Sequence, residues 1–307
     1  MDVLLGDPVY PAHPVRLMGW TLARLEKLLR ALKLDGYFGG ILLFLLLALV
    51  WCIGLCALVL AADYWSRWAG FLLQLFIVYS LIALRDLLQH GWAVELASRQ
   101  KSLPEAHCEV SKLVGRDTER MDFAACRRAV IESLSENLTD GFVSPIFWYV
   151  VAGLPGIVLF KVVSTMDSMV GYKTPQYLRF GWCGARLDDL MNWLPARINW
   201  LLIALCAALL PRCSGRKALR FGWRQHALIP GPNSGWSEAA TAGAIQRRLV
   251  GQIWRHGQLV TELWLGDPYD PPAGDELDVR WASVLVSATG LAAVLVAIVA
   301  IAAVQYL

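Results

Sequence analysis

Charged residues are scarce in this chain. Asp, Glu, Lys and Arg make up 17 % of its 307 residues and apolar residues 57 %, whereas soluble domains carry about 25 % charge. This composition excludes an ordinary soluble protein and indicates an integral membrane protein. The formal net charge is only +3, and basic and aromatic residues do not alternate along any segment, so we expect no nucleic-acid partner.

Several common site and processing motifs are also missing. Neither GxxxxGK[ST] nor GxGxxG occurs, so neither of the two common nucleotide-binding folds is indicated. The 7 cysteines form no CxxC pair, and we expect buried free thiols rather than disulfides or a zinc site. The first residues lack the basic segment and short apolar stretch of a secretory signal, so none is expected.

Long apolar runs are present instead. Residues 39–62 and 281–303 are each long enough to cross about 30 Å of hydrocarbon, and residues 69–84 predict a further span. Residues 142–160 are interrupted by proline and glycine, and residues 198–211 are short, so both predict partial or re-entrant segments. With helical periodicity throughout, residues 1–307 are expected to form one all-α, polytopic membrane domain with negligible sheet.

The distribution of lysine and arginine predicts the orientation. The positive-inside rule places the N-terminus in the cytoplasm. If 142–160 and 198–211 both crossed fully, the polar segment 161–197 would lie outside, away from cytosolic nucleotides. We therefore expect neither to cross fully, and cytoplasmic helical loops to form the active site.

Two polar regions have readable helical patterns. Residues 14–34 carry Met18, Leu22, Leu25, Leu29 and Leu32 on one stripe, which suits either a helix lying on an anionic leaflet or a surface helix packed into the domain. Residues 85–140 predict two helices with a break near 102–104. Both regions would lie outside the spans.

The segment ESLSENLTDG repeats an acid every four residues. Glu132, Glu136 and Asp140 are expected to stack on one helical face. Carboxylates at this spacing can bind Mg²⁺ together with substrate phosphates. The alternative is a solvated acidic face, but this one runs directly into an apolar segment, which favours a metal site.

The segment 161–197 carries the next candidates. Lys161, Thr165 and Ser168 recur at helical spacing beside Asp167, and Lys173 follows a glycine. A lysine, hydroxyls and a carboxylate suit binding of nucleotide phosphates.

Further along the same segment, charges and an amide follow one another closely. Arg186, Asp188, Asp189, Asn192 and Arg197 lie there, with Asp188 and Asn192 one helical turn apart and able to orient one another or share a metal. Plain Arg–Asp pairing is the alternative.

Two loops complete the set. Asp7, His13 and Arg16 lie in a turn-rich stretch, where Asp7 suits Mg²⁺ and Arg16 a phosphate or carboxylate. An ordinary turn and helix start is the alternative. Asn233 lies in a Pro/Gly loop before a helix that is expected to start at Ser237 and to be capped by it. The exposed backbone amides at the start of such a helix can bind an anion.

Five motifs occur in a characteristic order. LLGDPxxxxHPVRxMG, ESLSENxxDG, STMDSMVGYK, FGxxxARLDDxxNxxPAR and PNSGW together resemble the CbiB/CobD family of cobalamin biosynthesis, the adenosylcobinamide(-phosphate) synthases. The resemblance covers nearly the whole chain. One departure is Ser164, where the family pattern has Asn before Thr-Met-Asp.

The resemblance implies an ATP- and Mg²⁺-dependent acid-amine ligase of the bacterial inner membrane. Its substrates would be the corrinoid adenosylcobyric acid and (R)-1-amino-2-propanol or its O-phosphate, and its partners the lipid bilayer and other membrane enzymes of late cobalamin assembly. The expected metal ligands are Asp7, Glu132, Glu136, Asp140, Asp167, Asp188 and Asp189. The expected ATP-binding residues are Arg16, Lys161, Thr165, Ser168, Lys173, Arg186, Arg197 and Asn233. Glu136, Asp167, His13 and Lys173 are the candidate catalytic residues.

Two other functions remain as alternatives. One is a non-catalytic membrane sensor resembling AmpE, which would not need this density of acidic and basic motifs. The other is a membrane alcohol phosphotransferase, whose compact spacing of Asp-Gly and paired aspartates is absent. Binding of Mg²⁺ and ATP in detergent would separate these classes.

Overall fold

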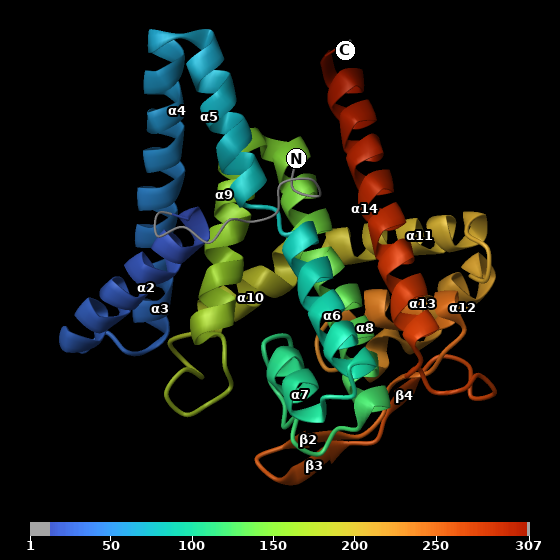
Figure 1. The fold of residues 1–307 in the computed structure, drawn as a ribbon. Helices are drawn as coiled ribbons and strands as arrows, with labels where there is room; N and C mark the ends of the chain where they lie inside the picture. The colour runs from blue at the N-terminus through green and yellow to red at the C-terminus, as the bar shows by residue number, and fades with distance from the viewer. Residues whose placement is uncertain (1–12, 306–307) are drawn as a thin grey trace. The chain divides into compact units, whose positions relative to one another are not determined.

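The structure of the protein is a computed structural model, and it describes residues 13–305. Helices dominate it, as the sequence predicts, and the only strands in this part of the chain form two small two-stranded sheets (Figure 1). The all-α fold class is therefore confirmed. The helices divide into two compact units, residues 13–83 with 144–192 and residues 84–143 with 193–305. A single domain over 1–307 remains a prediction.

Within residues 13–83 and 144–192, the first unit contains six helices. They are α2 (Pro14–Ala31), α3 (Tyr37–Ala48), α4 (Gly54–Trp65), α5 (Arg67–Ser80), α9 (Ser144–Val170) and α10 (Trp182–Met191), with a π-helical turn at Leu49–Ile53 between α3 and α4. Helices α4 and α5 run side by side as a hairpin (Figure 1). Its turn exposes Tyr64, Trp65 and Trp68, as expected for aromatic anchors at a membrane interface.

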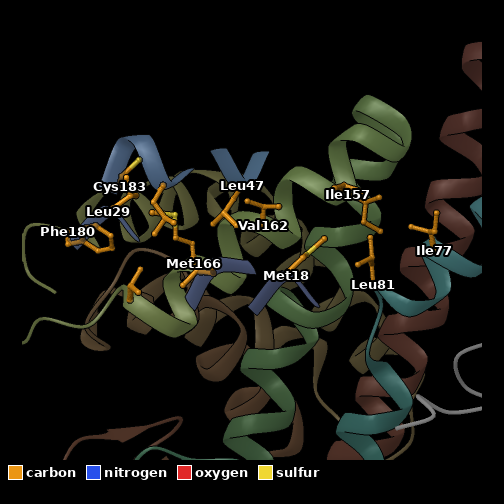
Figure 2. Packing of buried hydrophobic residues seen from close by; sticks show 14 of the residues in the cluster. Met18, Leu29, Leu47, Ile77, Leu81, Ile157, Val162, Met166, Phe180 and Cys183 are labelled. Atoms are coloured by element: carbon orange, nitrogen blue, oxygen red, sulfur yellow. The ribbon is translucent and has the colours of Figure 1, made fainter. Parts of the chain in front are cut away.

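An apolar core joins α2, α3, α5 and α9. Figure 2 shows Met18 and Leu29 of α2 in one buried cluster with Leu47, Ile77 and Met166. Met18, Leu22 and Leu29 of the predicted stripe are thus buried inside the unit, whereas Leu32 at its end is 61 % exposed. This observation favours the packed surface helix over a helix that lies on the leaflet.

Helix α9 is broken in the middle. Ala152 and Gly153 leave the helical region, and Gly153 has φ 61° and ψ −147°, a conformation that only glycine adopts without strain. A Cβ added at Gly156 would clash with the carbonyl oxygen of Trp148. In a straight helix, residues 148 and 156 would be about 12 Å apart, so the chain folds back at Gly153. Partial or re-entrant insertion of 142–160 remains a prediction.

The second unit contains the other helices and the strands that lie within residues 13–305. Its helices are α6 (Leu84–Arg99), α7 (Leu103–Ser111), α8 (Phe123–Leu138), α11 (Trp193–Leu209), α12 (Gly215–Gln225), α13 (Ser234–Ile245) and α14 (Glu276–Gln305). A π-helical turn follows α8 at Thr139–Val143, and a 3₁₀ turn follows α12 at His226–Leu228. Residues 85–140 thus form three helices, because residues 112–122 leave the helical path. The expectation of two helices was wrong, although a break does lie near 102.

The strands lie in one loop region. β1 (Leu249–Val250) pairs antiparallel with β4 (Trp264–Leu265), and β2 (Ile253–Arg255) pairs antiparallel with β3 (Gln258–Thr261). His256 and Gly257 both have positive φ at the tip between β2 and β3, as a tight hairpin requires.

Several helices are long and apolar enough to cross a membrane. The four segments are Tyr37–Trp65, Arg67–Arg99, Phe123–Val170 and Glu276–Ala303, and the bent pair Trp182–Met191 with Trp193–Leu209 would be a fifth. The polytopic membrane class is therefore supported. Which residues of the broken and bent segments lie in the bilayer stays a prediction.

Candidate functional site

A buried ion pair marks the acidic motif on α8. Arg116, in the loop before α8, donates from Nη2 to Oε2 of Glu132 at 2.7 Å, and the two side chains are 7 % and 10 % exposed. The other oxygen of Glu132 accepts the backbone N–H of Val250 on β1 at 3.0 Å. Both oxygens of Glu132 are therefore satisfied, and its charge is compensated within the fold.

A cavity of about 700 Å³ opens beside this pair. Its apolar walls come from the loops at 113–114 and 228–230 and from the two small sheets. Its polar groups are Arg116, Glu132, Ser133, Glu136, Ser234, Glu238, Arg255 and Thr261. Convergence of several polar groups within apolar walls is a usual form of a small-molecule site.

Glu136 and Glu238 are the distinctive groups in this cavity. Glu238 of α13 is only 7 % exposed, while Glu136 is exposed to the cavity. Neither carboxylate has a hydrogen-bond or ion-pair partner among residues 13–305. Burial, and after it the neighbouring carboxylates of Glu136 and Glu132, raise the pKa of Glu238 well above its usual range.

Such carboxylates fit a cationic ligand. In the described part of the chain, no three Asp, Glu, His or Cys side chains are arranged to hold a metal ion by themselves. Mg²⁺, however, is commonly bound by one or two carboxylates together with substrate phosphates and water. Glu136 and Glu238 supply that donor set, and Arg116 and Arg255 supply positive charge in the same cavity.

Asp140 does not complete this set. The sequence predicts that it stacks with Glu132 and Glu136, but it lies in the π-helical turn Thr139–Val143 and outside the residues that line the cavity. A π turn closes i to i+5 hydrogen bonds and so advances less angle per residue than an α-helix. The expected common face of the three acids therefore ends at Glu136.

The first unit holds a second acidic group. Asp188 on α10 lies close enough to Asp167 on α9 for their charges to interact, and Asp189 is a further neighbour. Gly184 permits this approach, because a Cβ there would lie 2.9 Å from Cγ of Met166. Asn192 donates to Asp188 Oδ2 at 3.0 Å, as the spacing predicts.

The cations proposed for phosphate lie around these acids. Lys161 interacts with the charge of Asp188, and Lys173 with that of Asp189. Arg186 forms an exposed ion pair with Asp189 at 3.6 Å. Thr165 is half-buried and Ser168 exposed on α9. The motif STMDSMVGYK is therefore close to ARLDD in space.

The N-terminal motif is only partly described. Asp7 lies outside the described residues. His13 is buried directly before Pro14, the first residue of α2, and Arg16 is exposed on the first turn of that helix.

Arg197 and Asn233 lie in the second unit. The Arg197 guanidinium lies over the rings of Trp193 and Trp236, 4.2 and 4.9 Å from their centroids. Asn233 is buried and precedes α13, which begins at Ser234. The expected start and cap at Ser237 were wrong, because the Ser237 hydroxyl donates to the Ser234 carbonyl inside the first turn.

Comparison with known proteins identifies the family. A family profile described as CobD/Cbib protein matches residues 1–286. The chain belongs to the CobD/CbiB family. Cobalamin biosynthesis protein CobD of Klebsiella pneumoniae is 38 % identical over 284 residues, covering 90 % of this chain and 88 % of that protein. Cobalamin biosynthesis protein CbiB of Salmonella typhimurium is 34 % identical over 304 residues, covering 97 % and 94 %. No solved structure matches the chain.

Family membership confirms the resemblance carried by the five motifs. Within this CobD/CbiB chain, three charged residues of the cavity had no role expected from the sequence, namely Arg116, Glu238 and Arg255. Glu238 follows PNSGW by two residues, and Arg116 and Arg255 lie in segments without a motif. Only the folded chain brings them to Glu132 and Glu136, which are distant in sequence from Glu238.

Proposed function

We propose that this chain is an ATP- and Mg²⁺-dependent amide ligase of cobalamin biosynthesis. It would join the corrinoid adenosylcobyric acid to (R)-1-amino-2-propanol or its O-phosphate, giving adenosylcobinamide or its phosphate. Membership of the CobD/CbiB family and the name shared by its relatives support the pathway. The observation that supports the chemistry is the pair of unpartnered carboxylates in the Arg116–Glu132 cavity.

The cavity residues suit a phosphate-bearing substrate with its metal. Glu136 and Glu238 would hold Mg²⁺, which neutralises phosphate charge and supports phosphoryl transfer to a carboxyl group when bound. Arg116 holds the Glu132 carboxyl group in place through the 2.7 Å pair. Arg255, on the hairpin that lines the cavity, is available for phosphate oxygens.

The acids and lysines of the first unit support the same proposal. Asp167, Asp188 and Asp189 offer further oxygen ligands, and Lys161 and Lys173 offer cations for phosphate or for a substrate carboxyl. His13, Arg16, Asp140, Arg197 and Asn233 keep their proposed roles in binding or catalysis, and so does Asp7. We place the chain in the bacterial inner membrane with these residues on the cytoplasmic side.

Product formation by purified protein in detergent tests the proposal. Adenosylcobyric acid, aminopropanol or its phosphate, ATP and Mg²⁺ should give the amide product and ADP, detected by mass spectrometry. Glu136→Gln should abolish product, whereas Glu119→Gln, an exposed acid in the same unit, should not. Binding without turnover by wild-type protein would favour the AmpE-like sensor, and transfer of a phosphoalcohol group would favour the phosphotransferase.

A further inference from the structure

An exposed apolar row lies along α11. Leu201, Leu205 and Leu209 recur every four residues and are at least half exposed, on the side of the helix opposite to its packing on α13 and α14. The uncharged part of α11, residues 198–209, is about 18 Å long and too short to cross about 30 Å of hydrocarbon. Such a row suits a helix that lies in the plane of the membrane interface.

Helix α12 runs alongside α11 in the opposite direction. A Cβ on Gly215 would lie 2.5 Å from the carbonyl oxygen of Ala204, and a Cβ on Gly222 would lie 2.4 Å from the ring of Trp200. Because the later residue of α12 meets the earlier residue of α11, the two helices are antiparallel. Because the close approaches lie near both ends of α12, the two helices form one layer.

The exposed side of α12 is basic and amphipathic. It carries Arg216, Leu219, Arg220, Trp223 and Arg224, all of them exposed. Arg216 and Arg224 have no hydrogen-bond or ion-pair partner within residues 13–305. The Trp223 ring stacks with that of Trp200 on α11, with the centroids 6.0 Å apart. The basic side of α12 therefore continues onto α11.

Helix α14 shows which way the leucine row points. The first turn of α14 lies beside the end of α13, where Arg247 Nε and Asp278 Oδ1 are 2.8 Å apart. Further along α14, Thr289 contacts Cys206 on α11. The residues of α14 beyond Thr289 therefore extend on the side of α11 away from α13, the side to which the leucine row is exposed (Figure 1). These residues belong to the predicted span 281–303.

We propose that the exposed sides of α11 and α12 form a docking surface for anionic phospholipid at the membrane interface. The leucine row and Leu219 would lie against the upper acyl carbons, and Trp223 at the level of the headgroups. Arg216 and Arg224 would contact lipid phosphates. Both arginines lie on one helix of a single layer, so they reach a common level.

The charge of this surface favours lipid over a second copy of the chain. In a symmetric dimer the same surface would face itself, so the arginines of α12 would meet like charges. Anionic headgroups offer the opposite charge beside an apolar phase for the leucines. Helix α13, which carries Glu238, packs on the other side of α11 and α12. The bound lipid would thus lie one helix layer from the cavity of Glu136 and Glu238.

Photocrosslinking of full-length protein tests this surface. p-Benzoylphenylalanine replaces Leu205 or Leu219, or Leu259 on the exposed β3 strand as a control. Each protein is reconstituted in nanodiscs with equal amounts of phosphatidylglycerol and phosphatidylcholine, irradiated and analysed by mass spectrometry. The probes at 205 and 219 should form phospholipid adducts, with phosphatidylglycerol in excess at 219, and the probe at 259 should form none.

Two charge variants, both with the probe at 219, separate specific contact from general attraction. Arg216→Gln/Arg224→Gln should lower the ratio of phosphatidylglycerol to phosphatidylcholine adducts by about 5- to 30-fold, the range for one or both arginines at about 1 kcal/mol each. Lys101→Gln/Arg120→Gln removes the same charge from exposed loop residues and should leave the ratio unchanged. Absence of lipid adducts at 205 and 219, adducts with protein in their place, equal labelling of the two lipids in the protein without charge substitutions, or an equal fall in the loop variant would each overturn the proposal.

Discussion

Replacing Arg116 by Met should destabilise the second unit strongly. The side chain is 7 % exposed and its 2.7 Å bond to Glu132 compensates a carboxylate that is itself only 10 % exposed. Removing one partner of a buried pair typically costs about 3–5 kcal/mol, because the other charge stays buried. Here the remaining carboxylate of Glu132 also lies near those of Glu136 and Glu238, which adds repulsion.

The magnitude can be checked by thermal unfolding in detergent with a chelator present, followed by tryptophan fluorescence. At about 2–4 °C per kcal/mol for a unit of this size, the apparent Tm should fall by about 6–20 °C. Arg120→Met is the control from the same loop. It removes a guanidinium that lies 4.4 Å from the centroid of the Trp254 ring, and such contacts contribute about 0.5–1 kcal/mol at exposed sites.

A second variant makes the reasoning refutable. Arg116→Met/Glu132→Gln removes the orphaned charge and keeps an acceptor for the Val250 N–H, so it should recover most of the lost Tm. If the apparent Tm of Arg116→Met equals that of wild type, or if the double variant has no higher Tm than Arg116→Met, the ion pair does not have the assigned role.

Three further outcomes follow from the same geometry. Glu238→Gln should raise the apparent Tm in the presence of a chelator. Because the pKa of Glu238 is raised in the folded state, wild-type stability falls as pH rises above the ordinary pKa of a glutamate, so the gain in Tm should vanish near pH 4 and grow above neutrality. A gain in Tm that does not depend on pH would contradict this reasoning. Mg²⁺ should raise the Tm of wild type but not of Glu136→Gln, measured by the same scan. Gly153→Ala should lower the free energy of unfolding by about 1–3 kcal/mol, because alanine is strained at the positive φ of this position. Gly54→Ala, in α4, should leave the free energy of unfolding unchanged or raise it. An equal loss of stability in the two variants would refute the strain argument.

Apolar run length predicted much of the fold. The predicted spans at 39–62 and 281–303 lie within segments that are long and apolar enough to cross a membrane. Uncharged runs of this length are typical of membrane-spanning helices, so run length alone was enough to find them. The proline and glycine content of 142–160 predicted an interruption, and the structure breaks at Gly153. The strands at 249–265 were not predicted, since two to four residues carry too little periodic signal.

The candidate site was predictable only where its residues share one helix. Glu132 and Glu136 were found from their spacing, and Asp188 with Asn192 in the same way. Glu238 joins Glu136 through the packing of α13 on α8, which no local pattern encodes. Asp140 was misplaced because a π turn cannot be read from spacing that assumes a regular α-helix.

Formation of the amide by purified protein is the most direct test of the proposed function. With adenosylcobyric acid, aminopropanol phosphate, ATP and Mg²⁺, wild-type protein should release product and ADP in equal amounts. Glu136→Gln and Glu238→Gln should each lose product while remaining folded, and Glu119→Gln should retain the wild-type rate. Absence of product from folded wild-type protein with either aminopropanol or its phosphate would contradict the ligase, and full activity in both cavity variants would contradict the role of the Arg116–Glu132 cavity.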